Sequence, residues 1–223
     1  MDHSVILLDF ERIWPSVPYI LQGVQVTLAY TAVSLCLGLL WGTFLGLCKV
    51  GRLSALRWGA SFYISLFRGT PLLLQLMLIY HATPQLTGYT ISIWEAGILT
   101  FTLNSGAYIA EHIRGGILAV DKGQMEAALS LGIPYPWIMK DIILPQAIRT
   151  ILPSLVNESI DLLKESALIS VIGGADILRR ANIVASEKYL YFEPLIIAGA
   201  LYYVLVMILT FAAHLLEKRL KTS

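Results

Sequence analysis

The sequence predicts an all-α, polytopic membrane protein with about five transmembrane helices and one long cytoplasmic insert. Of its 223 residues, 57% are hydrophobic and only 14% are charged, whereas soluble domains are nearer a quarter charged. The mean hydropathy is +0.70, and several apolar runs approach the ~20 residues that one bilayer crossing needs. We therefore expect residues 1–223 to form a single transmembrane domain with no separate soluble domain.

Residues 1–18 are predicted to be an external or interfacial N-terminal segment. The acidic residues Asp2, Asp9 and Glu11 do not suit a signal peptide. Aromatic and aliphatic side chains in the same segment suit the membrane surface.

The first span runs from about Tyr19 to Leu47 and carries glycines at positions 38, 42 and 46. Four-residue spacing places these glycines on one helix face, where another helix can approach closely. The alternative is the ordinary tolerance of glycine in membrane helices. Cys36 and Cys48 are interpreted as small hydrophobic residues, with no disulfide or metal site.

The second span covers about residues 58–82 and holds a charge, Arg68, in the run SLFRGTPLLLQLMLIY. A charge at membrane depth usually faces a partner or a wet cavity, and Pro71 frees backbone carbonyls that an arginine can satisfy. We therefore expect Arg68 to be buried near mid-depth, and Arg68, Gly69 and Pro71 to have a gating or structural role. The alternative is an arginine that extends to the interface from near a helix end.

The third span runs from about Ile93 to Ile113. At its end, Glu111 and Arg114 have the three-residue spacing of an intrahelical ion pair.

The insert, residues 121–145, is charged and rich in glycine and proline, with the sequence DKGQMEAALSLGIPYPWIMKDIILP. A helix is predicted over residues 124–131, with Met125, Ala128 and Leu129 on one face. Asp121 caps this helix, and Gly132 ends it with a positive φ angle.

Two prolines, Pro134 and Pro136, are expected to stop that helix and force an extended corner. A second short helix over residues 137–143 then ends before Pro145, which opens the fourth span. The two adjacent alanines give the predicted helix–corner–helix a surface without large side chains, which a groove in another protein can enclose.

The fourth span runs from Pro145 to about Leu163, residues 164–193 are mixed, and the last span covers about residues 195–216. Most basic residues outside the spans fall on one side in this topology: Lys49, Arg52, Arg57, Arg114, Lys122, Lys140, Arg149, Lys218, Arg219 and Lys221. The positive-inside rule then predicts an external N-terminus, a cytoplasmic insert and a cytoplasmic C-terminus.

The insert also carries a family pattern. The series Glu126-Ala127-Ala128, then Gly132, then Ile142-Ile143-Leu144-Pro145 resembles the EAA loop of ATP-binding-cassette importer permeases. Further segments extend this match: FRGTPLLLQ (67–75), LNSGAYIAEHIRGGILAVDKGQ (103–124) and LPQAIRTILPSLVNESIDLLKES (144–166). They are similar to the polar amino acid uptake branch, whose members carry histidine, glutamine, arginine, cystine or opines.

The resemblance implies a type I importer permease in the inner membrane, which moves a polar amino acid by alternating access. It implies three kinds of partner: two ATPase subunits, a second permease copy or paralogue, and an external solute-binding protein. The coupling residues would be Gln124, Glu126, Ala127, Ala128, Ser130, Gly132 and Pro145. Glu126 would meet a basic group of the ATPase or order the loop; alternatively, it only favours the helix dipole.

A set of polar residues is the candidate substrate pathway, because a cavity needs both signs of charge to recognise an amino acid. They are Gln75, Asn104, Asn157, Glu158, Asp161, Lys164 and Glu165. The alternative is that Lys164 only neutralises its acidic neighbours. The family often has Lys-Asp-Thr-Ser where this chain has Lys164-Glu165-Ser166-Ala167, so the identity of the ligand stays open.

Other functions fit the sequence less well. The chain has no GxxxxGK[ST] phosphate loop, so ATP and Mg²⁺ would bind only to the partner ATPase, and no catalytic set or metal-ligand spacing is evident. A net charge of +1 gives no electrostatic case for nucleic acid. One rival is a secondary transporter driven by an ion gradient, in which Glu158 and Asp161 carry protons. Another is a membrane enzyme that uses His81, Glu111 or His112.

Overall fold

A computed structural model describes residues 8–51 and 53–221 of this chain, and all regular structure within these ranges is helical. Part of the predicted N-terminal segment (residues 1–7) and Arg52, which was used to predict orientation, lie outside the described residues.

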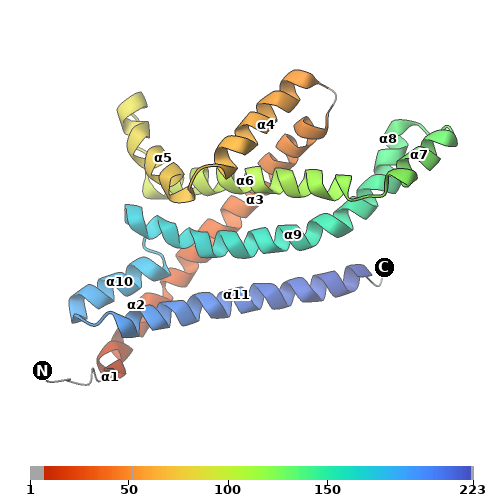
Figure 1. The fold of residues 1–223 in the computed structure, drawn as a ribbon. Helices are drawn as coiled ribbons and strands as arrows, with labels where there is room; N and C mark the ends of the chain where they lie inside the picture. Colours follow the sequence, from red (N-terminus) through yellow and green to blue (C-terminus); the bar gives the residue numbers. More distant parts are fainter. Residues whose placement is uncertain (1–7, 52, 222–223) are drawn as a thin grey trace, which may run out of the picture.

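The chain begins with two short helices, α1 (Phe10–Ile13) and α2 (Val17–Leu21), which are joined by a 3₁₀ turn and lead directly into the long α3 (Gly23–Val50). The backbone N–H of Asp9 donates a hydrogen bond of 2.7 Å to Glu193 at the start of the last helix. The first membrane-crossing stretch is therefore longer than predicted, because the N-terminal segment continues it and packs on the end of the bundle (Figure 1).

The glycines of α3 face α6 (Ile93–Leu118). A Cβ added to Gly42 would lie 2.7 Å from the carbonyl oxygen of Gly106 and from Ile109, and one added to Gly38 would lie 3.3 Å from Ser105. These distances confirm that the glycine stripe allows two helix backbones to approach closely.

The second predicted span is two helices, α4 (Ser54–Arg68) and α5 (Leu72–Thr87), which are bent by 101°. The second predicted span is therefore broken near its middle and is not one straight helix. Helix α4 ends where the Gly69 N–H bonds to the Ser65 carbonyl, and Pro71 follows in an extended conformation with no N–H to continue a helix.

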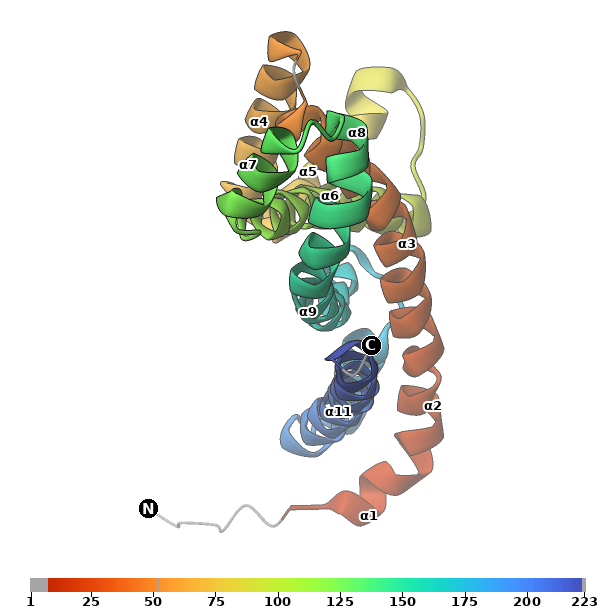
Figure 2. The same cartoon turned by 90° about the vertical axis from the view of Figure 1, so that its right-hand side faces the viewer.

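Three long helices form a stack, with α9 (Leu144–Glu165) between α6 and α11 (Phe192–Lys221), while α3 crosses along one side (Figure 2). The mixed stretch after α9 forms the 3₁₀ helix η3 (Ser166–Ile172) and α10 (Ile177–Lys188).

By length and hydropathy alone, the described residues contain two candidate spans, Phe10–Val50 and Phe192–Leu215, or three if the bent pair counts as one. Helices α6 and α9 are 26 and 22 residues long, which corresponds to about 39 and 33 Å, enough to cross a bilayer. They carry more polar residues than the other long helices, and those polar residues form much of the candidate site.

Candidate functional site

One end of the bundle carries a compact projection, the coupling unit, which consists of α7 (Lys122–Ser130), α8 (Tyr135–Trp137) and the π-helical turn η2 (Ile138–Ile143) (Figure 1). The side chain of Asp121 caps α7 and accepts a hydrogen bond of 2.7 Å from the Gly123 N–H. Gly132 has a φ of +73°, and the Ile133 N–H bonds back to the Ala128 carbonyl at 3.1 Å. The predicted cap and glycine stop are both confirmed.

The second half of the coupling unit differs from the prediction. Pro134 is extended as expected, but Pro136 lies in the first turn of α8, where a proline needs no N–H partner. The chain then continues through η2 into α9 without a break, so the predicted end of a short helix before Pro145 is wrong. Pro145 lies in the first turn of α9. In an α-helix its ring would clash with the carbonyl four residues earlier, and the wider π-helical turn of η2 leaves room for it.

The coupling unit has a small apolar core, in which Ala128, Ile138 and Ile143 are buried. Met125 is half-buried against it, whereas Leu129 is 53% exposed, so the predicted shared face of Met125, Ala128 and Leu129 is only partly correct. The remaining predicted coupling residues on α7 are exposed: Gln124, Glu126, Ala127 and Ser130.

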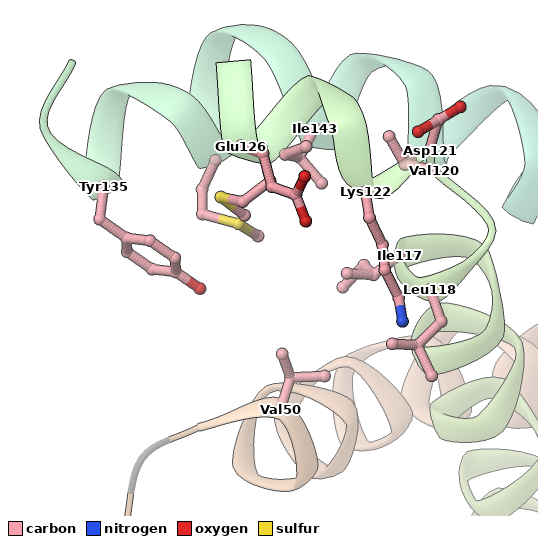
Figure 3. A pocket seen from close by; sticks show the side chains of 11 residues that line it. Val50, Ile117, Leu118, Val120, Asp121, Lys122, Glu126, Tyr135 and Ile143 are labelled. Carbon is pink, nitrogen blue, oxygen red and sulfur yellow. The ribbon is translucent and has the colours of Figure 1, made fainter. Parts of the chain in front are cut away.

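A cavity of about 300 Å³ separates the coupling unit from the ends of α3 and α6 (Figure 3). Its walls include Val50, Ile117 and Met125, and the Glu126 carboxylate points into it. The coupling unit therefore does not pack tightly onto the end of the bundle at this point.

Two predicted pathway residues hold the bend between α4 and α5. The Gln75 side chain, which is buried, donates hydrogen bonds of 2.8 and 3.1 Å to the carbonyls of Phe67 and Thr70. Its amide oxygen accepts a 2.9 Å hydrogen bond from Asn104 of α6, which also donates to the Phe67 carbonyl at 3.3 Å. Carbonyls freed by the break at Pro71 are thus satisfied by two amides.

Arg68 does not occupy the predicted position. It is the last residue of α4, its side chain is 43% exposed, and it does not bond to the carbonyls at the bend. The expectation of a buried Arg68 is wrong, because Gln75 and Asn104 already occupy the interior of the bend. Gating or structural roles for Arg68, Gly69 and Pro71 stay predictions.

Glu111 of α6 is the centre of an ion-pair cluster whose members come from three helices. One carboxylate oxygen pairs with Lys49 of α3, and the other accepts hydrogen bonds of 2.8 and 3.0 Å from Arg114. The Arg68 guanidinium lies 3.9 Å from that second oxygen. The intrahelical pair with Arg114 is confirmed. The contacts with Lys49 and Arg68 were not predicted, because both depend on how helices distant in the sequence pack.

At the far end of α9, Asp161, Lys164 and Glu165 line one pocket of about 370 Å³, as their spacing predicted. The Lys164 ammonium lies 2.7 Å from the Asp161 carboxylate, and both side chains are more than half exposed. This ion pair is the one that the neutralisation alternative requires. The pocket around this ion pair is open, and the role of these three residues in substrate binding stays a prediction.

The other two predicted pathway residues of α9 are neighbours in the sequence, but their side chains have different surroundings. Asn157 is exposed, whereas Glu158 is buried and faces α6, where its carboxylate lies 3.7 Å from the His112 ring nitrogen. The seven candidates therefore do not form one site: Gln75 and Asn104 hold the bend, Glu158 pairs with α6, and the rest lie on the open side of α9.

Between α9 and α11, Asp176 caps α10 by accepting hydrogen bonds from the N–H groups of Leu178 and Arg179. Tyr202 of α11 also donates to it at 2.9 Å. Burial raises the pKa of Asp176 above its ordinary value, although these hydrogen bonds oppose the shift. This carboxyl fixes α10 to α11 at the end opposite the coupling unit.

Comparison with known families gives one match that covers most of the chain. The profile of the family described as "Binding-protein-dependent transport system inner membrane component" matches residues 35–222.

Two curated relatives match nearly end to end. A putative glutamine transport system permease protein of Rickettsia felis is 52% identical over 209 residues, which are 94% of this chain and 96% of that protein. An arginine transport system permease protein of Bacillus subtilis is 50% identical over 216 residues, 97% of this chain and 99% of that protein.

Solved structures agree with the fold. A crystal structure of an amino acid ABC transporter with histidines has a TM-score of 0.92 and 44% identity, and the match covers 96% of this chain and 100% of that one. An inward-facing MetNI methionine ABC transporter has a TM-score of 0.77 with 23% identity, covering 92% and 98%, which supports the fold alone.

Proposed function

This chain belongs to the family of binding-protein-dependent transport system inner membrane components, and from that premise we propose that it is the permease of an ATP-driven importer of polar amino acids. Its own role is to form the pathway, and ATP hydrolysis takes place in a separate subunit. The observation that carries the proposal is the near end-to-end similarity, at 50% identity or more, to proteins named as amino acid permeases.

The coupling unit is the proposed docking site for the ATPase. It combines a buried anchor, Ala128, with exposed apolar side chains, Leu129 and Leu131, of which Leu131 is 79% exposed. Such a short helix with small residues can be enclosed by a groove of a partner. One ATPase subunit would dock on this chain and another on a second permease copy or paralogue, and both would bind ATP and Mg²⁺.

The orientation in the membrane follows from the same assignment. A coupling unit that meets ATPases must be cytoplasmic, which places α10 and the N-terminal helices on the external side, where a solute-binding protein would deliver the cargo. The C-terminal end of α11 lies at the coupling-unit end of the bundle (Figure 1) and would be cytoplasmic. These positions agree with the distribution of basic residues.

The cargo would enter at the open side of α9. Lys164 suits the carboxylate of an amino acid, and Asp161 or Glu165 suits its ammonium group or a cationic side chain. The ion pair between Lys164 and Asp161 would then be exchanged for pairs with the zwitterion.

Reconstitution tests this proposal. The permease, its ATPase and its binding protein are placed in lipid vesicles, and polar amino acids are screened for uptake and for stimulation of ATP hydrolysis. We expect at least one amino acid to stimulate both. If none does, or if the purified chain alone takes up an amino acid under a proton or sodium gradient, the proposal fails, and the second result would favour the secondary transporter.

A further inference from the structure

A polar pocket of about 410 Å³, which we call the inner pocket, lies between α3, α4 and α6 and apart from the candidate residues of α9. It has charged and hydroxyl side chains in its wall: Lys49, Ser61, Ser65, Arg68, Tyr108 and Glu111. Polar walls of this kind within a bundle of membrane helices face water or a polar ligand, because burying them against lipid is costly.

The charges around the inner pocket do not balance. Three cations, Lys49, Arg68 and Arg114, surround the single carboxylate of Glu111. Lys49 and Arg114 already occupy both of its oxygens, and Arg68 at 3.9 Å is beyond hydrogen-bond distance. Within the described residues, no other carboxylate lies within ion-pair distance of these cations.

Arg68 is the cation with unused bonding capacity. Its guanidinium lies over the ring of Tyr108, 5.2 Å from the centroid, which restricts its orientation. No described residue accepts a hydrogen bond from it, and its side chain is 43% exposed. The guanidinium of Arg68 therefore faces the pocket with its fork of donors available.

The donors match a carboxylate. A guanidinium fork binds a carboxylate through two parallel hydrogen bonds, and Ser65 and Ser61, which precede Arg68 by three and seven residues on the same helix, add hydroxyl donors. We propose that the inner pocket binds the α-carboxylate of the cargo amino acid on its way to the cytoplasm, with Arg68 as the principal donor. This inference rests on the proposed function.

A phospholipid headgroup is the other source of an anion for this pocket. Arg68 shares Glu111 with Lys49, and Lys49 is the residue before Val50, where α3 ends and which lines the cavity beside the coupling unit. The inner pocket therefore lies toward the coupling-unit end of α3, and the experiment must separate a carboxylate from a lipid phosphate. The serines of α4 extend its polar stripe from Arg68 toward the start of the helix, as an aqueous exit path for the cargo requires.

The test measures access to Arg68 directly. The permease–ATPase complex is purified without nucleotide and treated with phenylglyoxal, which modifies accessible guanidinium groups, and mass spectrometry follows each arginine. We expect sodium acetate and L-glutamine to slow modification of Arg68, by about tenfold at ten times the dissociation constant. Acetamide, at equal ionic strength, should give no protection. Arg57 of the same helix does not line the pocket, and its modification should be unchanged.

Transport gives a second measurement. In reconstituted vesicles, Arg68→Gln should lower kcat for L-glutamine or L-arginine uptake about tenfold or more, because the carboxylate loses a charged hydrogen-bond donor in the pocket. KM, which is set at the external binding protein, should be little changed. Arg68→Lys, which keeps the charge but not the fork, should be intermediate, and Arg57→Gln is the matched control. Co-purification of the ATPase verifies that each variant is assembled.

The outcomes separate the inference from the proposed function. Amino acid uptake by the wild-type complex without protection of Arg68 by acetate overturns the inference alone. Protection by phosphatidylglycerol but not by acetate also overturns it, in favour of a lipid phosphate. If acetate protects Arg68 in a complex that transports no amino acid, the anion that the pocket binds is not a transported amino acid, and both the inference and the proposed function are overturned.

Discussion

Replacing Gly132 tests the connection between the coupling unit and transport. Its φ of +73° is a conformation that costs other residues about 1–2 kcal/mol. A Cβ at this position would meet no atom within 4 Å. The cost is therefore conformational, and it is confined to the turn that ends α7.

That cost is large for so small an element. Helix α7 has only nine residues, and the N–H groups of Gly132 and Ile133 close it through bonds of 2.9 and 3.1 Å. A penalty of about 1–2 kcal/mol shifts the local equilibrium about 5- to 30-fold away from the closed turn. We expect Gly132→Asp and Gly132→Val to insert normally but to lose stimulation of ATP hydrolysis by ligand-loaded binding protein. Gly132→Asn should retain more stimulation than Gly132→Val, because asparagine tolerates a positive φ better than a β-branched residue does.

Ligand-stimulated ATPase activity of the full complex in lipid vesicles is the assay, with protein yield and ATPase co-purification as measures of insertion and assembly. Gly59→Ala is the matched control, because Gly59 is helical and a Cβ there also meets nothing within 4 Å. Equal stimulation in wild type and Gly132→Val would refute the reasoning, since it would mean that the turn does not transmit the signal.

Three further predictions concern packing, charge and docking. Gly42→Ala should lower the free energy of unfolding by about 1–3 kcal/mol, because its Cβ would lie 2.7 Å from the Gly106 carbonyl oxygen and from the branched side chain of Ile109. Thermal unfolding in detergent measures this change, and a midpoint as high as that of Gly59→Ala would contradict it. Glu111→Gln should cost about 1 kcal/mol by leaving Lys49 and Arg114, which are 20% and 36% exposed, without their counter-charge. An unchanged thermal midpoint in the same assay argues against it. Replacing residues 124–132 by a flexible glycine–serine tether should abolish co-purification of the ATPase and solute uptake, and continued uptake would remove the coupling role.

Local features of the fold could be predicted from the sequence where one residue type decides the conformation. The glycine spacing at 38, 42 and 46 identified the face of α3 that packs on another helix. Gly132 was predicted to have a positive φ because a helix candidate ended immediately before it.

Features that depend on tertiary contacts were not predictable in the same way. The two helices on either side of the Gly69–Pro71 break are together apolar enough for one span, so hydropathy does not distinguish a straight span from one bent by 101°. The burial of Arg68 was predicted wrongly because sequence cannot tell which side chain reaches the freed carbonyls, and Gln75 and Asn104 do. The cluster around Glu111 joins residues 62 positions apart, a separation at which spacing rules carry no information.

The unbroken path from η2 into α9 has a mechanical consequence. Without a break between them, the two segments would act as one lever, whose short arm is the proposed docking site for the ATPases and whose long arm runs to Pro153, a proline inside α9 at which the helix can bend. From Leu144 to Pro153, about 13 Å, a swing of about 10° displaces the end of this arm by about 2 Å. The bend at Pro153 would then set how much of a push at one membrane surface reaches Glu165 near the other.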